Sequence, residues 1–499
     1  MLRLKVKYFD LFTNYPLAIL NVENAKDLGI NPNDRIKVTY NSHKEILIVE
    51  TTHKLVPKGQ IGMNIEALEI DSVKDGKFVR VEPVGKPISV EYIKKKLSGK
   101  ELTPEECRCI IDDINDNCLS NIEMGAYVSA VYTHDFSMKE LTAIVSEMVN
   151  TGKKFHWNHR LVSDKHSIGG VPGNRITPII VSIVASAGLV IPKTSSRAIT
   201  SPSGTADTME VWCNVNFNRS EIKKIVEKTG SCFVWGGAVD MAPTDDKIIN
   251  AEYPLSLDPE GQLIASVMAK KIAMGAKYLI IDIPFGLQTK VATLEDAETL
   301  AIKFKKIGKM FDIKTECTIT VGDQPIGIGL GPVPEAIDIL GVLEGNGQKD
   351  LKEKSIELAG ALLKMTGKGD KKTAEHILDS KIALAKFKEI VKAQKGDPDK
   401  DLHSMLGKYI FSVKSKRSGK VSSIHNKELT QIARLAGAPV DIGSGIILKK
   451  KLDDPVAKGD ILFEIYSEKE FKLKNAKMLL ERFDPIVVQD HQNILVKKI

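Results

Sequence analysis

The chain has 499 residues, of which 42% are hydrophobic and 6% aromatic, so its composition is globular and its length exceeds what one core usually holds. The net charge of +7 is mild and both signs are interspersed, which argues against a nucleic-acid partner. The sequence has no apolar run of about 18 residues and six cysteines without a CxxC pair, and we do not expect MLRLKVKYFDLF to be a signal peptide because its apolar positions alternate with lysines. We therefore expect a cytoplasmic protein of several domains, with no membrane segment, metal site or disulfide framework.

The N-terminal segment, residues 1–86, has the pattern of a small β domain. LRLKVKYF and RIKVTY alternate apolar and polar positions, as half-buried strands do. We expect a barrel-like fold or a sandwich. This segment carries no cluster of catalytic side chains, so we interpret it as an assembly or covering domain.

A helical pattern follows the N-terminal domain. Thr103 and Ser137 each precede a glutamate at the spacing of a capping box, which predicts a helix start at both positions. We expect a helical lobe formed by residues 87–155 and 244–275, with one helix over 260–274.

Strands and helices then alternate, which predicts an α/β lobe formed by residues 156–243 and 276–407, with a mixed sheet. CFVWGG, YLIIDI and IKTECTITV have the pattern of buried strands, and ligands of such sheets bind beyond the carboxyl ends of the strands. Residues 408–499 return to strands with one helix near 427–436, which predicts a small α+β domain. Within it, KGDILFEIYS has the pattern of a hairpin.

Two loops rich in glycine and hydroxyl groups flank an apolar segment between residues 164 and 210. Glycine lets the backbone approach a ligand, hydroxyls donate hydrogen bonds, and Lys and Arg add positive charge. The first loop contains Lys165, His166, Ser167, Gly169, Gly170, Gly173 and Arg175. The second loop contains Lys193, Thr194, Ser195, Ser196, Arg197, Thr200, Ser201, Ser203, Gly204 and Thr205.

Each loop precedes an expected helix. Thr177 before Pro178 has the pattern of a cap, and Asp207 and Glu210 are expected early in the second helix. Helix N-termini bind anions well, so the two loops predict a site for one phosphate or two. The alternative is a pair of ordinary strand–helix turns, because neither loop is a Walker A or a strict dinucleotide motif.

The segment DKHSIGG (164–170) resembles DKHSTGG of the thymidine and pyrimidine-nucleoside phosphorylase family, and PKTSSRAITSPSGTADTME (192–210) resembles its second loop. Further segments match in order over roughly residues 88–490: INDNCLSNIEMGAYVSAVYTHDFSMKE, IASVMAKK, GDQPIG and LEGNGQKDL. The resemblance implies phosphorolysis of an N-glycosidic bond, a helical lobe facing an α/β lobe across a closing cleft, and at least a homodimer. The N-terminal domain is expected to support larger homo-oligomers.

The departures from the family pattern point to a nucleotide substrate. Ile168 replaces a threonine, SSRAITSPS replaces a glycine-rich run, and the pyrimidine-contacting arginine before IASVMAKK has no counterpart. With the extra N-terminal domain, these features resemble an archaeal branch that uses nucleoside 5′-monophosphates. The resemblance then implies that AMP, with CMP and UMP as further candidates, reacts with inorganic phosphate as co-substrate. The products would be the free base and ribose 1,5-bisphosphate, formed in nucleotide degradation without a cofactor.

The resemblance also assigns site residues. It places inorganic phosphate at Lys165, Ser167, Ser195 and Thr205, with Thr177 beside them. The 5′-phosphate and sugar are expected at Gly170, Ser196, Arg197, Ala198, Ile199, Thr200 and Ser201. Asp258 is the candidate proton donor to the base, Ser266 the candidate base or sugar contact, and Lys290 lies at the expected binding edge of the sheet.

Several of these residues also have purely structural interpretations. Ser167, Thr205 and Asp258 fit helix caps. His166 is either a general acid or a packed histidine, and Lys270 is either a base contact or a solvated lysine. Three other functions compete: a pyrimidine-nucleoside phosphorylase, a phosphoribosyltransferase of the anthranilate type that uses Mg²⁺, and a non-enzymatic assembly protein.

Overall fold

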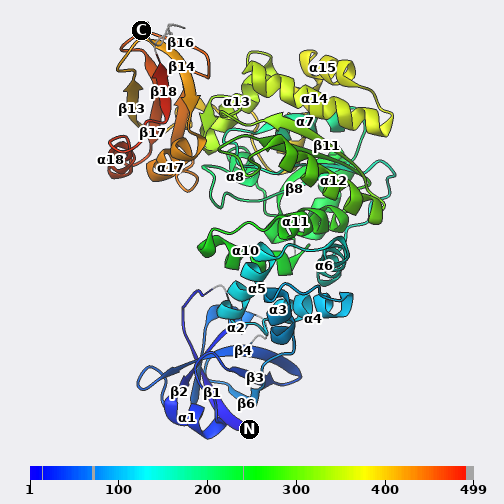
Figure 1. The fold of residues 1–499 in the computed structure, drawn as a ribbon, viewed down its shortest axis with the longest axis vertical. Coiled ribbons are helices and arrows are strands. Elements are labelled where there is room, and N and C mark those ends of the chain that lie inside the picture. Colours follow the sequence, from blue (N-terminus) through cyan, green and yellow to red (C-terminus); the bar gives the residue numbers. More distant parts are fainter. Residues whose placement is uncertain (14, 70–72, 240, 490–499) are drawn as a thin grey trace, which may run out of the picture. The chain divides into compact units, whose positions relative to one another are not determined.

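The structure is a computed structural model that describes residues 1–13, 15–69, 73–239 and 241–489 (Figure 1). Its contacts divide the chain into two compact units. The first unit is Met1–Lys153 with Met241–Ala273, and the second is Lys154–Asp240 with Met274–Ile499. Within the described residues, none of the helices combines the length and the apolar character that crossing a membrane requires.

The first unit begins with a small β domain. Its elements are β1 (Leu2–Tyr8), β2 (Leu17–Asn21), α1 (Val22–Leu28), β3 (Arg35–Tyr40), β4 (His43–Thr52), β5 (Gln60–Met63), α2 (Ile65–Glu69) and β6 (Phe78–Val84). The strands form a closed barrel in the order β1-β5-β2-β4-β3-β6, which leaves no open edge. Alternation in β1 and β3 buries Leu4, Val6, Ile36 and Val38 inside it. Of the two expected folds, the barrel is confirmed.

The rest of the first unit is helical. Its helices are α3 (Ser89–Leu97), α4 (Pro104–Asn115), α5 (Asn121–Thr133), α6 (Met138–Thr151), α10 (Pro243–Leu255) and α11 (Glu260–Ala273). Thr103 and Ser137 form the predicted capping boxes at the starts of α4 and α6. The ammonium of Lys96 in α3 lies 2.8 Å from both carboxylate oxygens of the buried Glu140 in α6, which joins the two helices.

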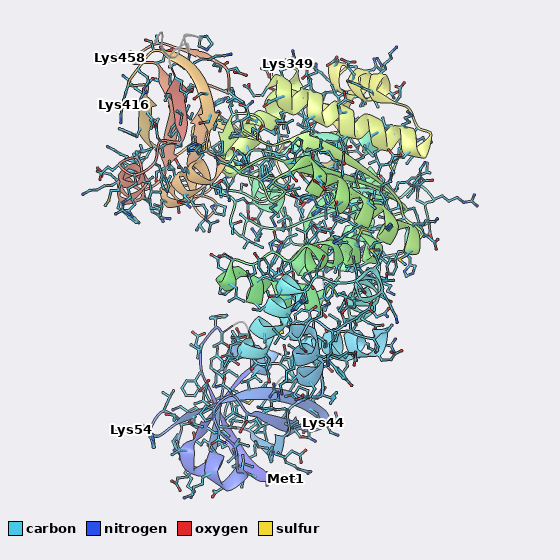
Figure 2. The ribbon with its side chains drawn as sticks, in the orientation of Figure 1. Met1, Lys44, Lys54, Lys349, Lys416 and Lys458 are labelled. Atoms are coloured by element: carbon cyan, nitrogen blue, oxygen red, sulfur yellow. The ribbon has the colours of Figure 1, made fainter. Side chains whose placement is uncertain are left out.

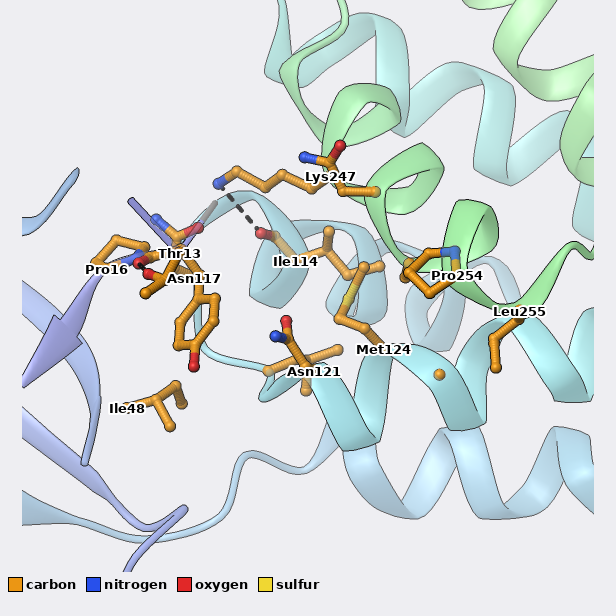
Figure 3. A pocket seen from close by; sticks show the side chains of 15 residues that line it. Thr13, Pro16, Ile48, Ile114, Asn117, Asn121, Met124, Lys247, Pro254 and Leu255 are labelled. Carbon is orange, nitrogen blue, oxygen red and sulfur yellow. Dashed lines mark hydrogen bonds between the residues drawn. The ribbon is translucent and has the colours of Figure 1, made fainter. Parts of the chain in front are cut away.

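A cavity of about 320 Å³ lies between the barrel and the helices of the first unit (Figure 3). Lys247 extends across it and donates hydrogen bonds to the carbonyl oxygens of Ile114 and Asn115. Burial lowers the pKa of Lys247. Apolar side chains such as Ile48 and Met124 line the cavity, whereas the predicted site residues do not.

Five parallel strands form the centre of the second unit. They are β7 (Ser163–Ser167), β8 (Ile191–Ser195), β9 (Ser231–Trp235), β10 (Tyr278–Phe285) and β11 (Lys314–Val321). The strands form two sheets, with the strand orders β11-β10-β7 and β8-β9. An isolated β-bridge between Val162 and Val190 connects the two sheets. We expected a mixed sheet, but every pair among these strands is parallel. The reason is that helices join the strands in sequence and return the chain to the same edge.

Helices surround these strands (Figure 1). They are α7 (Ile176–Ser186), α8 (Thr205–Glu210), α9 (Arg219–Thr229), η1 (Gly236–Ala238), α12 (Leu294–Met310), α13 (Pro332–Glu344), α14 (Lys349–Thr366), α15 (Lys371–Asp379), α16 (Ile382–Ala393) and η2 (His403–Met405). Every residue of α7 from Ile176 to Ala185 is buried, as its apolar sequence requires. Trp212 packs edge-on against Phe387 at 5.0 Å in the same core.

The C-terminal part of the second unit is a small α+β domain. Its elements are β12 (Gly329–Leu330), β13 (Tyr409–Lys414), β14 (Gly419–Ile424), α17 (Asn426–Ala436), β15 (Gly445–Leu448), β16 (Pro455–Val456), β17 (Ile461–Ser467), α18 (Glu470–Leu479) and β18 (Ile486–Gln489). The strands form two antiparallel sheets, β12-β15-β17-β13 and β16-β14-β18.

Two expectations for this domain were wrong. It has a second helix, α18. Of its ten residues, two are buried, Leu473 and Ala476, so its sequence shows little of the apolar periodicity that predicts a helix. The segment KGDILFEIYS forms one strand, β17, that pairs with β13 and β15 rather than a hairpin.

Candidate functional site

Lys165 on β7 is a buried cation. Many lysines of the chain, such as Lys44, Lys349 and Lys458, are exposed and point outward (Figure 2). Lys165 is only 1% exposed, and its ammonium donates to the Thr177 hydroxyl at 3.2 Å. Among the described residues, no carboxylate lies within ion-pair distance of it. Burial lowers the pKa of Lys165 to about 7, although Asp282 acts in the opposite direction. A desolvated cation without a carboxylate partner favours binding of a mobile anion.

Asp282 on β10 organises the polar groups beside Lys165. This fully buried carboxylate accepts hydrogen bonds from Ser167 at 2.6 Å and Thr320 at 2.7 Å, and it pairs with the Lys354 ammonium at 3.0 Å. Burial alone would raise the pKa of Asp282, but Lys354 and Lys165 outweigh burial and hold the pKa below its ordinary value. The predicted phosphate residue Ser167 thus directs its proton to a carboxylate and ends β7 without capping a helix.

Ser195 and Thr205 lie at the two ends of the second loop. The Ser195 hydroxyl, at the end of β8, is buried and has no hydrogen-bond partner among the described residues. An orphaned buried donor is costly, and a bound anion would satisfy it. Thr205 is the first residue of α8, and the N-cap is Gly204, so the cap interpretation of Thr205 is wrong. Its hydroxyl accepts a long hydrogen bond of 3.5 Å from Arg175.

Thr177 does not cap α7. The helix begins one residue earlier, at Ile176, and its N-cap is Arg175, whose side chain makes no capping bond. The Arg175 guanidinium instead donates to the buried Glu335 and to the carbonyl oxygen of Ser203. Arg175 therefore ties the end of the first loop to the second loop.

Asp207 fixes the shape of the second loop. Its carboxylate accepts hydrogen bonds from the backbone N–H of Gly204 at 2.8 Å and of Ala198 at 2.7 Å. The Arg197 guanidinium pairs with Asp207 and Glu210 and lies over the Trp235 ring, 5.1 Å from its centroid. Asp207 is in the first turn of α8 as predicted, whereas Glu210 ends the helix, because α8 has only six residues.

Arg197 is therefore held by two carboxylates, and its contact with a 5′-phosphate stays a prediction. The other members of that predicted group vary in exposure. Ser196, Ile199 and Thr200 are exposed, whereas Ala198 and Ser201 are half-buried. Ser201 donates to the carbonyl oxygen of Ser203 at 2.8 Å.

Replacing Asp207 with asparagine is expected to destabilise the second unit by about 1.5–3 kcal/mol, the range for hydrogen bonds to a charged group. The variant loses the Arg197 pair at Oδ1 and the negative charge on Oδ2, the oxygen that accepts both backbone hydrogen bonds. Denaturant unfolding followed by tryptophan fluorescence measures the change, because the three tryptophans, at 157, 212 and 235, all lie in this unit. An unchanged midpoint would show that Asp207 does not hold the loop.

Gly170 brings the first loop against the segment that contains Lys290. Its φ of +85° is in the region that favours glycine, and an added Cβ would lie 2.6 Å from the Lys290 backbone nitrogen. The Lys290 side chain is exposed, and His166 on β7 is half-buried. The substrate contacts predicted for Gly170 and Lys290, and the role of His166, stay predictions.

Asp258 and Ser266 belong to the first unit. Asp258 is exposed and stands two residues before the start of α11. Ser266 on α11 donates to the Asp245 carboxylate at 2.8 Å, and the Lys270 ammonium lies 2.5 Å from the same carboxylate oxygen. The solvated-lysine interpretation of Lys270 is therefore wrong. The proton transfer predicted for Asp258 stays a prediction.

Three residues of these clusters are not among the site residues predicted from the sequence: Asp282, Lys354 and Asp245. Asp282 had a visible signal, because an acid inside the apolar run YLIIDI must find partners. Lys354 and Asp245 stand in helices with many charged residues, and nothing in their local sequence marks them as buried.

Family models match three consecutive parts of the chain. Residues 90–152 match the helical bundle domain of a glycosyl transferase family, and residues 159–377 match the a/b domain of that family. Residues 420–483 match the pyrimidine nucleoside phosphorylase C-terminal domain. Together they cover the helical, α/β and C-terminal parts in the order in which the structure contains them.

Relatives of similar length share more than two fifths of the sequence. An AMP phosphorylase of Natronomonas pharaonis is 44% identical over 95% of this chain and 96% of its own. Those of Thermococcus kodakarensis and Pyrococcus furiosus are 43% and 44% identical over 98% of both chains. A solved anthranilate phosphoribosyltransferase from Thermus thermophilus is 16% identical with a TM-score of 0.52, covering 61% of this chain and 99% of its own, and shares the fold alone.

Proposed function

The chain belongs to the AMP phosphorylase family, and on that basis we propose that it cleaves nucleoside 5′-monophosphates with inorganic phosphate. AMP is the first substrate, and CMP and UMP are further candidates. The products are the free base and ribose 1,5-bisphosphate. Inorganic phosphate is the co-substrate, and the reaction uses no cofactor and no metal.

The observation that carries this proposal is the buried ammonium of Lys165, which has no carboxylate at ion-pair distance in the part of the chain that the structure describes. Thr177 holds it at 3.2 Å, and the second loop, which joins β8 to α8, adds the orphaned hydroxyl of Ser195. These groups suit one inorganic phosphate. The exposed hydroxyls of Ser196 and Thr200 are separate donors that suit a second phosphate, the one on the 5′-carbon of the nucleotide.

In the proposed reaction an oxygen of inorganic phosphate forms a bond to C1′ of the ribose as the bond from C1′ to the base breaks. The bonding electrons leave with the base, which then takes a proton, and we propose Asp258 as its donor. Holding the phosphate against C1′ can lower the barrier by about 7–11 kcal/mol in well-aligned cases. Charged donors around the phosphate and the departing base supply further stabilisation.

The test is product analysis with phosphate and five substrates: AMP, CMP, UMP, adenosine and uridine. We expect AMP to yield adenine and ribose 1,5-bisphosphate. Adenosine should have a kcat/KM about 10- to 100-fold lower than that for AMP. It lacks the 5′-phosphate, and each hydrogen bond to a charged group contributes about 1.5–3 kcal/mol. Equal rates for AMP and adenosine would remove the 5′-phosphate pocket from the proposal. Consumption of uridine without AMP would indicate a pyrimidine-nucleoside phosphorylase instead.

We also propose that the enzyme is a homodimer, and that the N-terminal barrel supports larger assemblies. Light scattering of the full chain measures the mass. A monomer at assay concentration would contradict the first statement.

A further inference from the structure

Asp245 is a buried carboxylate of the first unit that the proposed reaction has not used. It stands in the first turn of α10 and is 0% exposed. One carboxylate oxygen, Oδ2, accepts from the Ser266 hydroxyl at 2.8 Å and pairs with the Lys270 ammonium at 2.5 Å. The other, Oδ1, is buried without a hydrogen-bond partner among the described residues. The charge of Asp245 is therefore directed at these two residues of α11.

Ser266 and Lys270 are four residues apart on α11 and share one helix face. Ser266 gives its single proton to Asp245 and accepts a long hydrogen bond from Lys270, so its oxygen can offer its second lone pair to a further group. Lys270 has three N–H donors; one meets Asp245 at 2.5 Å, and another donates a long hydrogen bond of 3.5 Å to the Ser266 oxygen. The Lys270 side chain is 27% exposed, so a ligand can approach it. Burial would lower the pKa of Lys270, but Asp245, with help from Asp246 and Glu252, outweighs burial and raises it.

A purely structural role does not account for this arrangement. Acids in the first turn of a helix complement its dipole, and the exposed neighbour Asp246 can do so at no desolvation cost. A buried carboxylate costs stability unless its partners repay the loss of water, and an apolar side chain would serve packing better. At its position Asp245 accepts the hydrogen bond of the Ser266 hydroxyl and pairs with the Lys270 ammonium.

We propose that Asp245 is a positioning residue for the nucleobase. It holds Ser266 as an acceptor and Lys270 as a charged donor, so the pair meets a base edge that carries a donor beside an acceptor. The Lys270 charge then stabilises the electrons that stay on the departing base. This inference rests on the proposed function for the identity of the ligand.

The test compares Asp245→Asn with the wild type and with Asp246→Asn, which removes an exposed acid from the same helix. Calorimetry measures the affinity for adenine and for inorganic phosphate, and initial rates give kcat/KM for AMP. We expect Asp245→Asn to weaken adenine binding and lower kcat/KM about 10- to 100-fold. Phosphate binding should change less than about twofold, and Asp246→Asn should lose far less adenine affinity than Asp245→Asn, because Asp246 has the smaller effect on the pKa of Lys270.

A merely structural residue would give a different pattern, with adenine and phosphate affinity falling together. A parallel fall of both affinities would overturn the inference. So would an unchanged adenine affinity in Asp245→Asn, or a loss in Asp246→Asn equal to that in Asp245→Asn. If Asp245→Asn does not fold, Ser266→Ala keeps the Asp245–Lys270 pair and decides by the same two affinities. If the wild type binds adenine but leaves AMP intact, the proposed function fails. The inference is still decided by whether Asp245→Asn weakens the binding of adenine more than the binding of inorganic phosphate.

Discussion

Replacing Lys165 with methionine is expected to lower kcat/KM on the order of 10²–10³-fold, the range for removing one preorganised donor from a site of developing charge. Methionine keeps the length and apolar stem but removes the ammonium that is directed at Thr177. The folded protein should not lose stability, because Lys165 is buried without a carboxylate partner among the described residues and its charge is costly. Steady-state rates and a thermal melt measure the two effects.

The pKa of Lys165, lowered to about 7, gives this prediction a pH dependence. Anion binding requires the charged form, so affinity should fall as pH rises through about 7. Sulfate is the suitable probe because it stays a dianion throughout the range. In the wild type its affinity should decline between pH 6 and 8, whereas in Lys165→Met it should be weak and independent of pH.

The same shift has a stability consequence with a definite sign. The folded protein holds the pKa of Lys165 near 7, whereas an unfolded lysine titrates near 10.5, so the unfolded chain binds more protons between these values. The free energy of unfolding should therefore rise with pH across that window, and Lys165→Met should lose this slope. The exposed Lys349→Met is the control and should keep it. Identical slopes in Lys165→Met and the wild type would contradict the assignment.

Local features of the sequence predicted much of the fold. Capping boxes at Thr103 and Ser137 form because all of their groups lie within four residues. The run YLIIDI is a strand buried on both faces, since a continuous apolar stretch has no face for water. The two loops were recognisable because their glycines, hydroxyls and cations are neighbours in sequence.

The errors occurred where pairing partners are distant in sequence or where helices are short. Nothing near Ser167 indicates that its proton goes to Asp282, and nothing in α14 indicates that Lys354 meets the same carboxylate. Glu210 was placed early in a helix that ends after six residues. Helix α18 was missed because a helix that buries two residues lacks an apolar stripe.

Replacing Lys354 with methionine is expected to destabilise the second unit by about 3–5 kcal/mol, the cost of leaving a buried charge without its partner. The Lys354 side chain is 9% exposed and Asp282 is 0% exposed, so water cannot replace the lost ammonium. Lys352→Met is the matched control on the same helix. It removes a more exposed pair with Asp379, which should cost about 0–1 kcal/mol. Denaturant unfolding followed by tryptophan fluorescence compares them.

The Lys354 variant should also weaken phosphate binding, because Asp282 would keep its negative charge beside the anion and engage Lys165. Removing Lys354 also removes one cause of the lowered pKa of Lys165, so the pH at which sulfate affinity declines should move upward. The double variant with Asp282→Asn removes both charges and should recover most of the lost stability. If the single variant loses no more stability than Lys352→Met, Lys354 does not neutralise Asp282. In that case Lys165 would have to balance two roles, neutralising Asp282 and binding the phosphate.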